Sequence, residues 1–143
     1  SMLQDLAEKY AKMGIVTSAA ELFTEIEMWD QVVECYRRAG KENKAEQIVR
    51  ERLASGEETP RMFAALGDIT KDPSLYEKAV EVSKGRFADG YVALGQFYFE
   101  KGDIRTAATN YQKALAIRPL LPQVWFRLGT ISMQLGEWTT ALN

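Results

Sequence analysis

The stretch YVALGQFYFEKGD, residues 91–103, returns later in the chain as WFRLGTISMQLGE, residues 125–137. An aromatic residue, a Leu-Gly pair, a second Gly and a following Ala recur at a constant offset of 34 residues. The matched pairs are Tyr91 and Trp125, Leu94 and Leu128, Gly95 and Gly129, Gly102 and Gly136, and Ala107 and Ala141. Recurrence at a fixed interval of this length indicates a repeat protein, in which each unit buries its apolar face on the next.

Within each repeat, the spacing predicts two antiparallel helices in close contact. Gly95 and Ala107 are small, so the backbones of two helices can approach each other closely at these positions. Larger side chains should fill the space around this contact, and the candidates are Tyr91, Leu94, Tyr98 and Tyr111, with Ala114 further along the second helix. The pattern therefore places small residues where the helices cross and bulky residues around them.

Three residues mark the expected helix ends. Gly102 can adopt the left-handed conformation that ends a helix, and Asp103 can cap the helix that follows. Pro119 ends the second helix because its ring clashes with a continuing one. Together with the packing residues, they form a helix-turn-helix pattern of about 34 residues that resembles the tetratricopeptide repeat.

The pattern continues upstream in a less regular form, with full and shortened intervals alternating. Counterparts in the unit before residues 91–119 are Phe63, Leu66, Gly67 and Ala79. The next unit upstream contains Trp29, Val32, Val33, Tyr36, Gly40 and Ala45, and the first contains Leu6, Ala7, Tyr10, Gly14 and Ala19. We therefore predict one continuous array over residues 1–143, with units at approximately 3–26, 27–57, 58–84, 85–120 and 121–143.

The predicted fold is all-α, a right-handed superhelical α-solenoid of tetratricopeptide-like repeats. Expected helices are residues 3–13, 17–26, 29–39, 42–54, 60–70, 73–83, 86–101, 104–117 and 121–135, with a tenth opening near Trp138. The last unit is truncated, and Trp138 and Leu142 do not form the polar cap that ends a solenoid. We therefore expect the parent chain to extend beyond both ends; residues 1–2 are typical of a cloning remnant.

Composition argues against several functions. With 18 basic and 20 acidic residues, the net charge is −2, which gives no electrostatic attraction for nucleic acid or an acidic membrane. No apolar stretch is long enough to span a bilayer. The chain has one cysteine and no histidine, so a disulfide within the chain, a cysteine-ligated metal site and histidine catalysis are excluded. We expect no enzymatic activity, cofactor or metal, and a cytoplasmic or nuclear location.

The least regular stretch resembles one particular family of repeat proteins. AALGDITKDPSLYEKAVEVSKGRFA, residues 64–88, is similar to a segment of the tetratricopeptide repeat protein 27 family. EMWDQVVECYRRAGKENKAEQIVRERL before it and IRPLLPQVWFRLG after it resemble the matching segments in the same order. The resemblance implies an essential eukaryotic scaffold in chaperone-assisted assembly of large complexes, notably spliceosomal ribonucleoproteins, with a further association with cell-wall integrity.

The first helix of each pair should line a concave groove that binds a peptide or a helix of another protein. Residues expected to face it are Val92, Gln96, Phe99, Gln123, Phe126 and Thr130. An alternative is that Phe99 and Phe126 pack on neighbouring helices instead. The groove lacks the cationic donors that grip a carboxylate tail, since Arg127 is the single cation nearby.

Two further interpretations concern charge and the ends of the array. Residues 37–52 are rich in Arg and Lys and could face RNA, but acidic residues at helical spacing favour intrahelical pairs on a solvated face. An RNA-binding helical repeat is therefore the alternative function. Cys35 is expected to be a buried, inert thiol. Self-association through the apolar ends of the solenoid is also expected.

Overall fold

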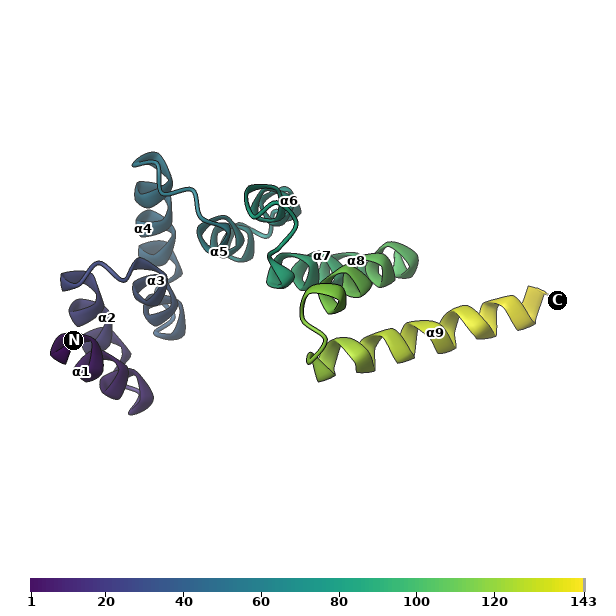
Figure 1. Ribbon diagram of the computed structural model, residues 1–143, viewed down its shortest axis with the longest axis horizontal. Coiled ribbons are helices and arrows are strands. Elements are labelled where there is room, and N and C mark those ends of the chain that lie inside the picture. The colour runs from purple at the N-terminus through teal and green to yellow at the C-terminus, as the bar shows by residue number, and fades with distance from the viewer. Residues whose placement is uncertain (143) are drawn as a thin grey trace. The chain divides into compact units, whose positions relative to one another are not determined.

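The computed structural model describes the backbone of residues 1–142 and the side chains of residues 1–136. Within this range the chain forms helices and no strands (Figure 1). The helices are α1 (Met2–Lys12), α2 (Val16–Glu25), α3 (Trp29–Arg38), α4 (Glu42–Ala54), α5 (Pro60–Thr70), α6 (Pro73–Val82), α7 (Ala88–Glu100), α8 (Ile104–Ile117) and α9 (Pro122–Leu142). The predicted helix class is confirmed, and most of the predicted boundaries agree closely with the observed ones.

The described chain comprises two compact units. The first spans Ser1–Lys71 and holds α1 to α5, and the second begins at Asp72 and holds α6 to α9. The boundary falls inside the predicted repeat unit 58–84. A single continuous array over the whole chain therefore stays a prediction.

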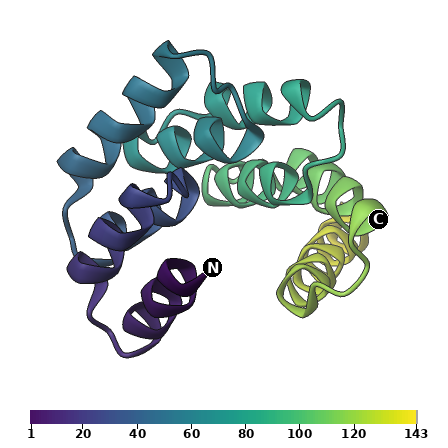
Figure 2. The same cartoon turned by 60° about the vertical axis from the view of Figure 1, so that its left-hand side comes forward.

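In the first unit each helix packs against the next in the chain, from α1 to α5 (Figure 2). The residues at these contacts are mostly small: Ala7, Ala19, Ala20, Val32 and Ala45 are completely buried. An alanine adds almost no bulk between two backbones, so neighbouring helices can approach closely. The small apolar residues predicted from the sequence spacing therefore lie where each helix packs on the next.

In the second unit the most extensive contact is between α7 and α8, and α6 and α9 pack on either side of this pair. The core cluster draws on α8 and α9, and its members are Ala107, Tyr111, Ala114, Leu115, Leu121, Val124 and Ile131. Toward α9 these buried residues are separated by three and seven positions, which is the spacing of one helix face. The opposite side of α9 is therefore left uncovered by the other described residues.

The turn between α7 and α8 forms as the sequence predicts. Gly102 has a φ of 86°, in the left-handed region that glycine adopts without a steric cost. The Asp103 carboxylate accepts a hydrogen bond from the backbone N–H of Thr106 at 3.2 Å and so caps α8. Arg118 is extended before Pro119, and α8 ends at Ile117.

The prediction of a tenth helix is wrong, because α9 continues through Gly136 to Leu142 as one helix of 21 residues. The sequence match between Gly102 and Gly136 predicted a break at this point. Too few residues follow Gly136 in this chain to make a stable second helix that could fold back on α9. Without packing to offset a turn, continuing the existing helix is the more favourable backbone conformation.

Candidate partner-binding surface

The contact between α7 and α8 is built on Gly95 and Tyr111. A Cβ atom on Gly95 would lie 2.6 Å from two ring atoms of Tyr111, closer than any real contact allows. The Tyr111 ring is almost fully buried and lies directly over the glycine backbone. A glycine is therefore required here so that the aromatic ring can seat against the helix.

A short polar chain leads from this contact to the surface. The Tyr111 hydroxyl donates a hydrogen bond to Gln96 Oε1 at 3.2 Å, and Gln96 Nε2 donates to Glu100 Oε1 at 2.7 Å. Burial raises the pKa of Tyr111, with Arg127 opposing the rise and Glu100 adding to it. The hydroxyl therefore stays protonated and satisfied at neutral pH, and Gln96 is held in one orientation.

Arg127 of α9 is held against α7 by an aromatic ring. Its guanidinium carbon lies 4.1 Å from the centroid of the Phe99 ring, within the range of a cation–π contact. It makes no ion pair with any residue whose side chain is described. The structure therefore fixes Arg127 on the Phe99 ring, and its N–H groups have no hydrogen-bond partner among the described residues.

The six predicted groove residues differ in their surroundings. Val92 and Phe99 are partly buried against the core cluster. Phe99 therefore packs on neighbouring helices, which was the alternative to its facing the groove. Gln96 is partly buried and hydrogen-bonded, and Thr130 donates to the backbone oxygen of Phe126 at 3.2 Å. Gln123 is exposed, and Phe126 is 79% exposed. Their common role in binding stays a prediction.

Most of the predicted packing residues are buried or partly buried. The buried ones are Ala45, Leu66, Gly67, Ala79, Leu94, Gly95, Ala107, Tyr111 and Ala114, and the partly buried ones are Trp29, Tyr36, Tyr91, Tyr98 and Leu128. Gly40 lies in the turn between α3 and α4 with a φ of 76°. Pro119 follows the end of α8. Ala141 lies outside the residues whose side chains are described.

Two predicted packing residues lie on the uncovered side of α9. The Trp125 side chain is 56% exposed, although its indole N–H donates to the backbone oxygen of Pro119 at 2.7 Å. Gly129 is exposed, and no described heavy atom lies within 4 Å of the position its Cβ would take. The motif therefore recurs in sequence, but its packing partner is absent among the described residues.

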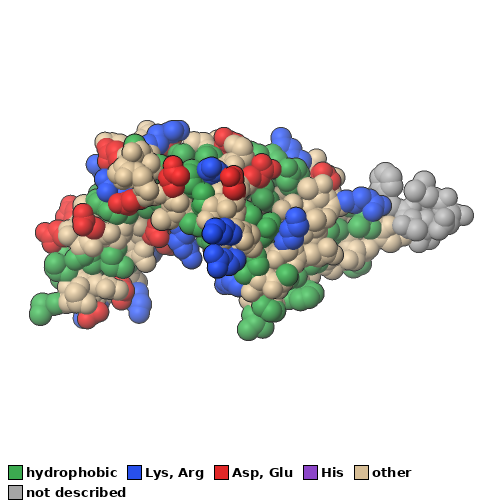
Figure 3. Space-filling view, turned by 45° about the horizontal axis from the view of Figure 1, so that its top comes forward, with side chains coloured by type: hydrophobic (Ala, Val, Ile, Leu, Met, Phe, Trp, Pro, Cys, Tyr) green, Lys and Arg blue, Asp and Glu red, His purple; other side chains and the backbone are tan. Residues whose placement is uncertain are grey.

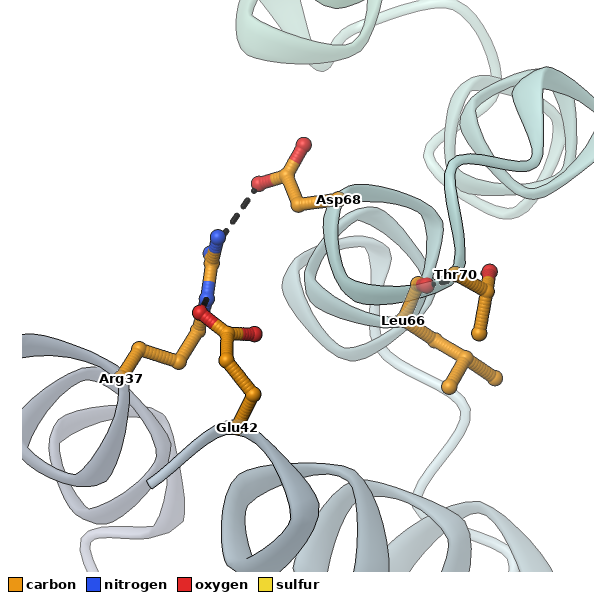
Figure 4. Close-up of polar contacts among 5 residues, drawn as sticks. All are labelled: Arg37, Glu42, Leu66, Asp68 and Thr70. Atoms are coloured by element: carbon orange, nitrogen blue, oxygen red, sulfur yellow. Dashed lines mark hydrogen bonds and ion pairs between the residues drawn. The ribbon is translucent and has the colours of Figure 1, made fainter. Parts of the chain in front are cut away.

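The arginines of residues 37–52 mostly have partners within the first unit. Arg37 bonds to Asp68 at 3.2 Å and lies 3.7 Å from Glu42, and so links α3, α4 and α5 (Figure 4). Arg50 pairs with Glu46 at 2.9 Å within α4. Figure 3 likewise shows acidic and basic side chains interspersed on the face it presents. Charges neutralised in this way offer little attraction to a phosphate backbone.

Arg52 and Cys35 are accounted for by packing in the same unit. The Arg52 guanidinium stacks on the Trp29 ring at 4.4 Å and pairs with Glu57 at 3.4 Å. Cys35 is buried, as predicted, and burial raises the pKa of its thiol. The reactive thiolate is therefore scarce at neutral pH.

Metal-binding and membrane-spanning features are not found in the described part of the chain. Its Cys, Asp and Glu residues nowhere form a group of three or more that could hold a metal ion. None of its helices is long and apolar enough to cross a membrane.

Solved structures with the same architecture identify the fold of this chain. The crystal structure of MamA has a TM-score of 0.71 with this chain at 18% identity, covering 91% of this chain and 84% of MamA. A thermophilic TPR protein of Thermus thermophilus gives a TM-score of 0.72 at 17% identity, covering 92% and 80%. Residues 95–136 also match the family model described as TPR repeat. The fold is therefore that of an all-α tetratricopeptide repeat protein.

Sequence relatives narrow the similarity to a smaller group of repeat proteins. The "Tetratricopeptide repeat protein 27 homolog" of Dictyostelium discoideum is 37% identical over 94% of this chain and 16% of its own length. The "Essential for maintenance of the cell wall protein 1" of Saccharomyces cerevisiae is 34% identical over 95% of this chain and 16% of its own length. The chain is similar to these relatives over nearly all of its own length, and it spans about a sixth of theirs.

Proposed function

We propose that this chain is a non-catalytic protein-interaction scaffold that binds its partner on the face formed by α7 and α9. The binding residues in this proposal are those of the predicted groove: Val92, Gln96, Phe99, Gln123, Phe126 and Thr130. The main support for this proposal is that Arg127 stacks on Phe99 beside this face and has no ion-pair partner among the described side chains. A cation fixed in this way can donate to a peptide carbonyl or carboxylate.

Preorganisation supports this choice of face. The amide of Gln96 is held by Tyr111 and Glu100, and the Arg127 guanidinium is held by the Phe99 ring. Side chains that are already fixed lose less rotational entropy when a partner binds. Exposed Phe126 adds an apolar anchor of the kind that contributes strongly at protein interfaces.

The wider role in this proposal follows the family. We place the chain in a eukaryotic scaffold that acts in chaperone-assisted assembly of large complexes such as spliceosomal ribonucleoproteins, in the cytoplasm and nucleus. The name of the S. cerevisiae relative refers to maintenance of the cell wall, which is compatible with an assembly factor that has several clients. Self-association through the exposed apolar ends is part of the same proposal.

The test selects peptides and then measures their affinities. Peptides chosen by display on the unmodified chain are titrated calorimetrically against Phe126→Glu and Gln123→Lys, two exposed positions on α9. We expect Phe126→Glu to weaken binding at least about tenfold. Met13→Glu, a change at an exposed residue after α1, is the matched control and should leave affinity unchanged. Equal affinity for all variants would place the binding surface elsewhere.

The alternative of an RNA-binding module predicts a different dependence on salt. Single-stranded RNA held by Z phosphate contacts loses affinity with a slope of about −0.7Z in a plot of log affinity against log salt concentration. The ion pairs of Arg37, Arg50 and Arg52 reduce the number of cations in residues 37–52 that could make such contacts. We expect no steep slope with mixed RNA, and a steep slope would favour the alternative.

A further inference from the structure

The basic stretch at residues 37–52 ends in two arginines at a set spacing before a serine. Arg50 and Arg52 lie five and three positions before Ser55, in the sequence RERLAS at residues 50–55. No other serine or threonine of the sequence has a basic residue at both of these positions. Two cations at this spacing before a hydroxyl can pair with acidic residues in the substrate groove of a basophilic protein kinase.

Ser55 lies at the surface, in the connection between α4 and α5 (Figure 1). Every residue from 54 to 59 is exposed, and Ser55 is the C-cap residue of α4. Gly56 follows with a φ of 95°, and beyond its chain neighbours no described heavy atom lies within 4 Å of the position its Cβ would take. The Ser55 hydroxyl is therefore on a segment that no other described element covers.

The last turn of α4 can open without releasing a buried side chain. On a helix Arg50 and Arg52 point to different sides, so residues 50–55 must extend before both arginines can enter one groove. The buried residues of α4 all precede this turn, and they are Ala45, Ile48 and Val49. Opening of a terminal turn with few buried contacts is among the least costly local unfolding events.

Arg52 has an unsatisfied donor beside this serine. Its Nε atom is buried without a hydrogen-bond partner among the described residues, and its guanidinium pairs with Glu57 at 3.4 Å. Ser55 lies one helical turn further along, and its hydroxyl donates to the backbone oxygen of Arg52 at 2.7 Å. A phosphate on Ser55 would bring acceptor oxygens near Arg52 and compete with Glu57 for it.

We propose that Ser55 is a phosphorylation site for a basophilic protein kinase that recognises Arg50 and Arg52. The Ser55 Oγ attacks the γ-phosphorus of ATP, the bond between that phosphorus and the β–γ bridging oxygen breaks, and ADP leaves with the electron pair. The hydroxyl proton passes to the catalytic carboxylate of the kinase. The site belongs to the first unit, so it does not depend on the α7–α9 face in the second.

Phosphorylation loosens the end of α4. The phosphate carries a charge of about −1.5 to −2 at neutral pH and lies at a helix C-terminus, where the backbone carbonyls carry partial negative charge. It also removes the proton that Ser55 donates to Arg52 and is repelled by Glu57 and Glu58. Arg52 is a single cation against these charges, so we expect faster hydrogen exchange of the amides in residues 53–57 after phosphorylation.

The test treats the full chain with ATP and a purified kinase that selects arginine five and three positions before its target. Mass spectrometry locates the phosphate, which we expect at Ser55 and not after Ser55→Ala. Arg50→Gln should lower kcat/KM at least about tenfold, because a charge-assisted contact with the kinase is lost. The Arg50 side chain is 58% exposed and pairs with Glu46 of the same helix, so this change should not prevent folding.

Two exposed residues of the second unit provide matched controls. Ser74→Ala removes a hydroxyl without arginines before it, and Arg105→Gln removes a cation outside the motif. Both variants should be phosphorylated at the rate of the unmodified chain. A peptide of residues 48–60 separates recognition of the motif from its accessibility in the folded chain.

Three outcomes would overturn the proposal. If the peptide is phosphorylated and the chain is not, α4 does not open and Ser55 is not a site in the folded protein. Equal rates for Arg50→Gln and the unmodified chain would show that the arginines are not recognised. A rate that rises with Arg50→Gln would assign Ser55 to an acidophilic kinase directed by Glu57 and Glu58. Unchanged or slower hydrogen exchange after phosphorylation would show that the phosphate does not loosen α4.

Discussion

Replacing Gly95 and Gly129 with alanine should change stability in opposite directions, although the two residues occupy the same position of the repeat. At Gly95, the new Cβ would lie 2.6 Å from the Tyr111 ring, whereas carbon atoms normally approach to about 3.5–4.0 Å. The ring would have to move by roughly 1 Å in a closely packed contact. Such overpacking costs about 1–3 kcal/mol.

Helix propensity acts in the other direction and is common to both changes. Alanine is more favourable than glycine inside a helix by about 0.8–1 kcal/mol. Gly95→Ala should therefore lower the free energy of unfolding by up to about 2 kcal/mol. Gly129→Ala meets open space and should raise it by up to about 1 kcal/mol.

Urea denaturation followed by far-ultraviolet circular dichroism measures this difference. Both glycines lie in the second unit, so the same unfolding transition reports on both changes. The difference between the two variants isolates the steric contribution, because the propensity gain cancels. Combining Gly95→Ala with Tyr111→Leu should recover part of the loss, since the smaller side chain relieves the clash. If Gly95→Ala is as stable as Gly129→Ala, the close contact with the ring does not exist.

Three further predictions concern titration, capping and an ion pair. Burial raises the pKa of Tyr111 in the folded protein, so the unfolded chain loses the hydroxyl proton first and the free energy of unfolding falls as the pH rises above about 10. Tyr111→Phe should reduce this loss. If the urea midpoints of the two proteins depend on pH in the same way, this reasoning is wrong. Asp103→Ala removes the acceptor for the Thr106 N–H and should cost about 0.5–2 kcal/mol in urea unfolding, and an unchanged midpoint would show that the cap contributes nothing. Arg37→Gln breaks the half-exposed pair with Asp68 and should cost at most about 1 kcal/mol, less in high salt; a loss independent of salt would point to packing instead.

How far the sequence predicts the candidate sites depends on which neighbours each residue has. The spacing alone showed that Gly95 recurs as Gly129. It could not show that the Tyr111 ring covers Gly95 while no described residue covers Gly129. The same limit applies to Phe99 and Phe126, which were predicted to share a groove; the first packs on the core cluster and the second is exposed. Arg127 was noted as a cation near the groove, but its contact with Phe99 was not predicted, because the ring belongs to a different helix and no local pattern connects the two.

The local elements of this protein follow from its sequence without further information. Glycines that tolerate a left-handed backbone, the Asp103 cap and Pro119 act within a few residues of themselves, so helix ends could be placed without knowledge of the packing. Small and aromatic residues at fixed spacing likewise predicted that helices pair. Only the tertiary structure shows which helix faces are buried by other helices, because those helices are distant in the chain. For the same reason α9 continues past Gly136: a turn there forms only if a following helix packs back against α9.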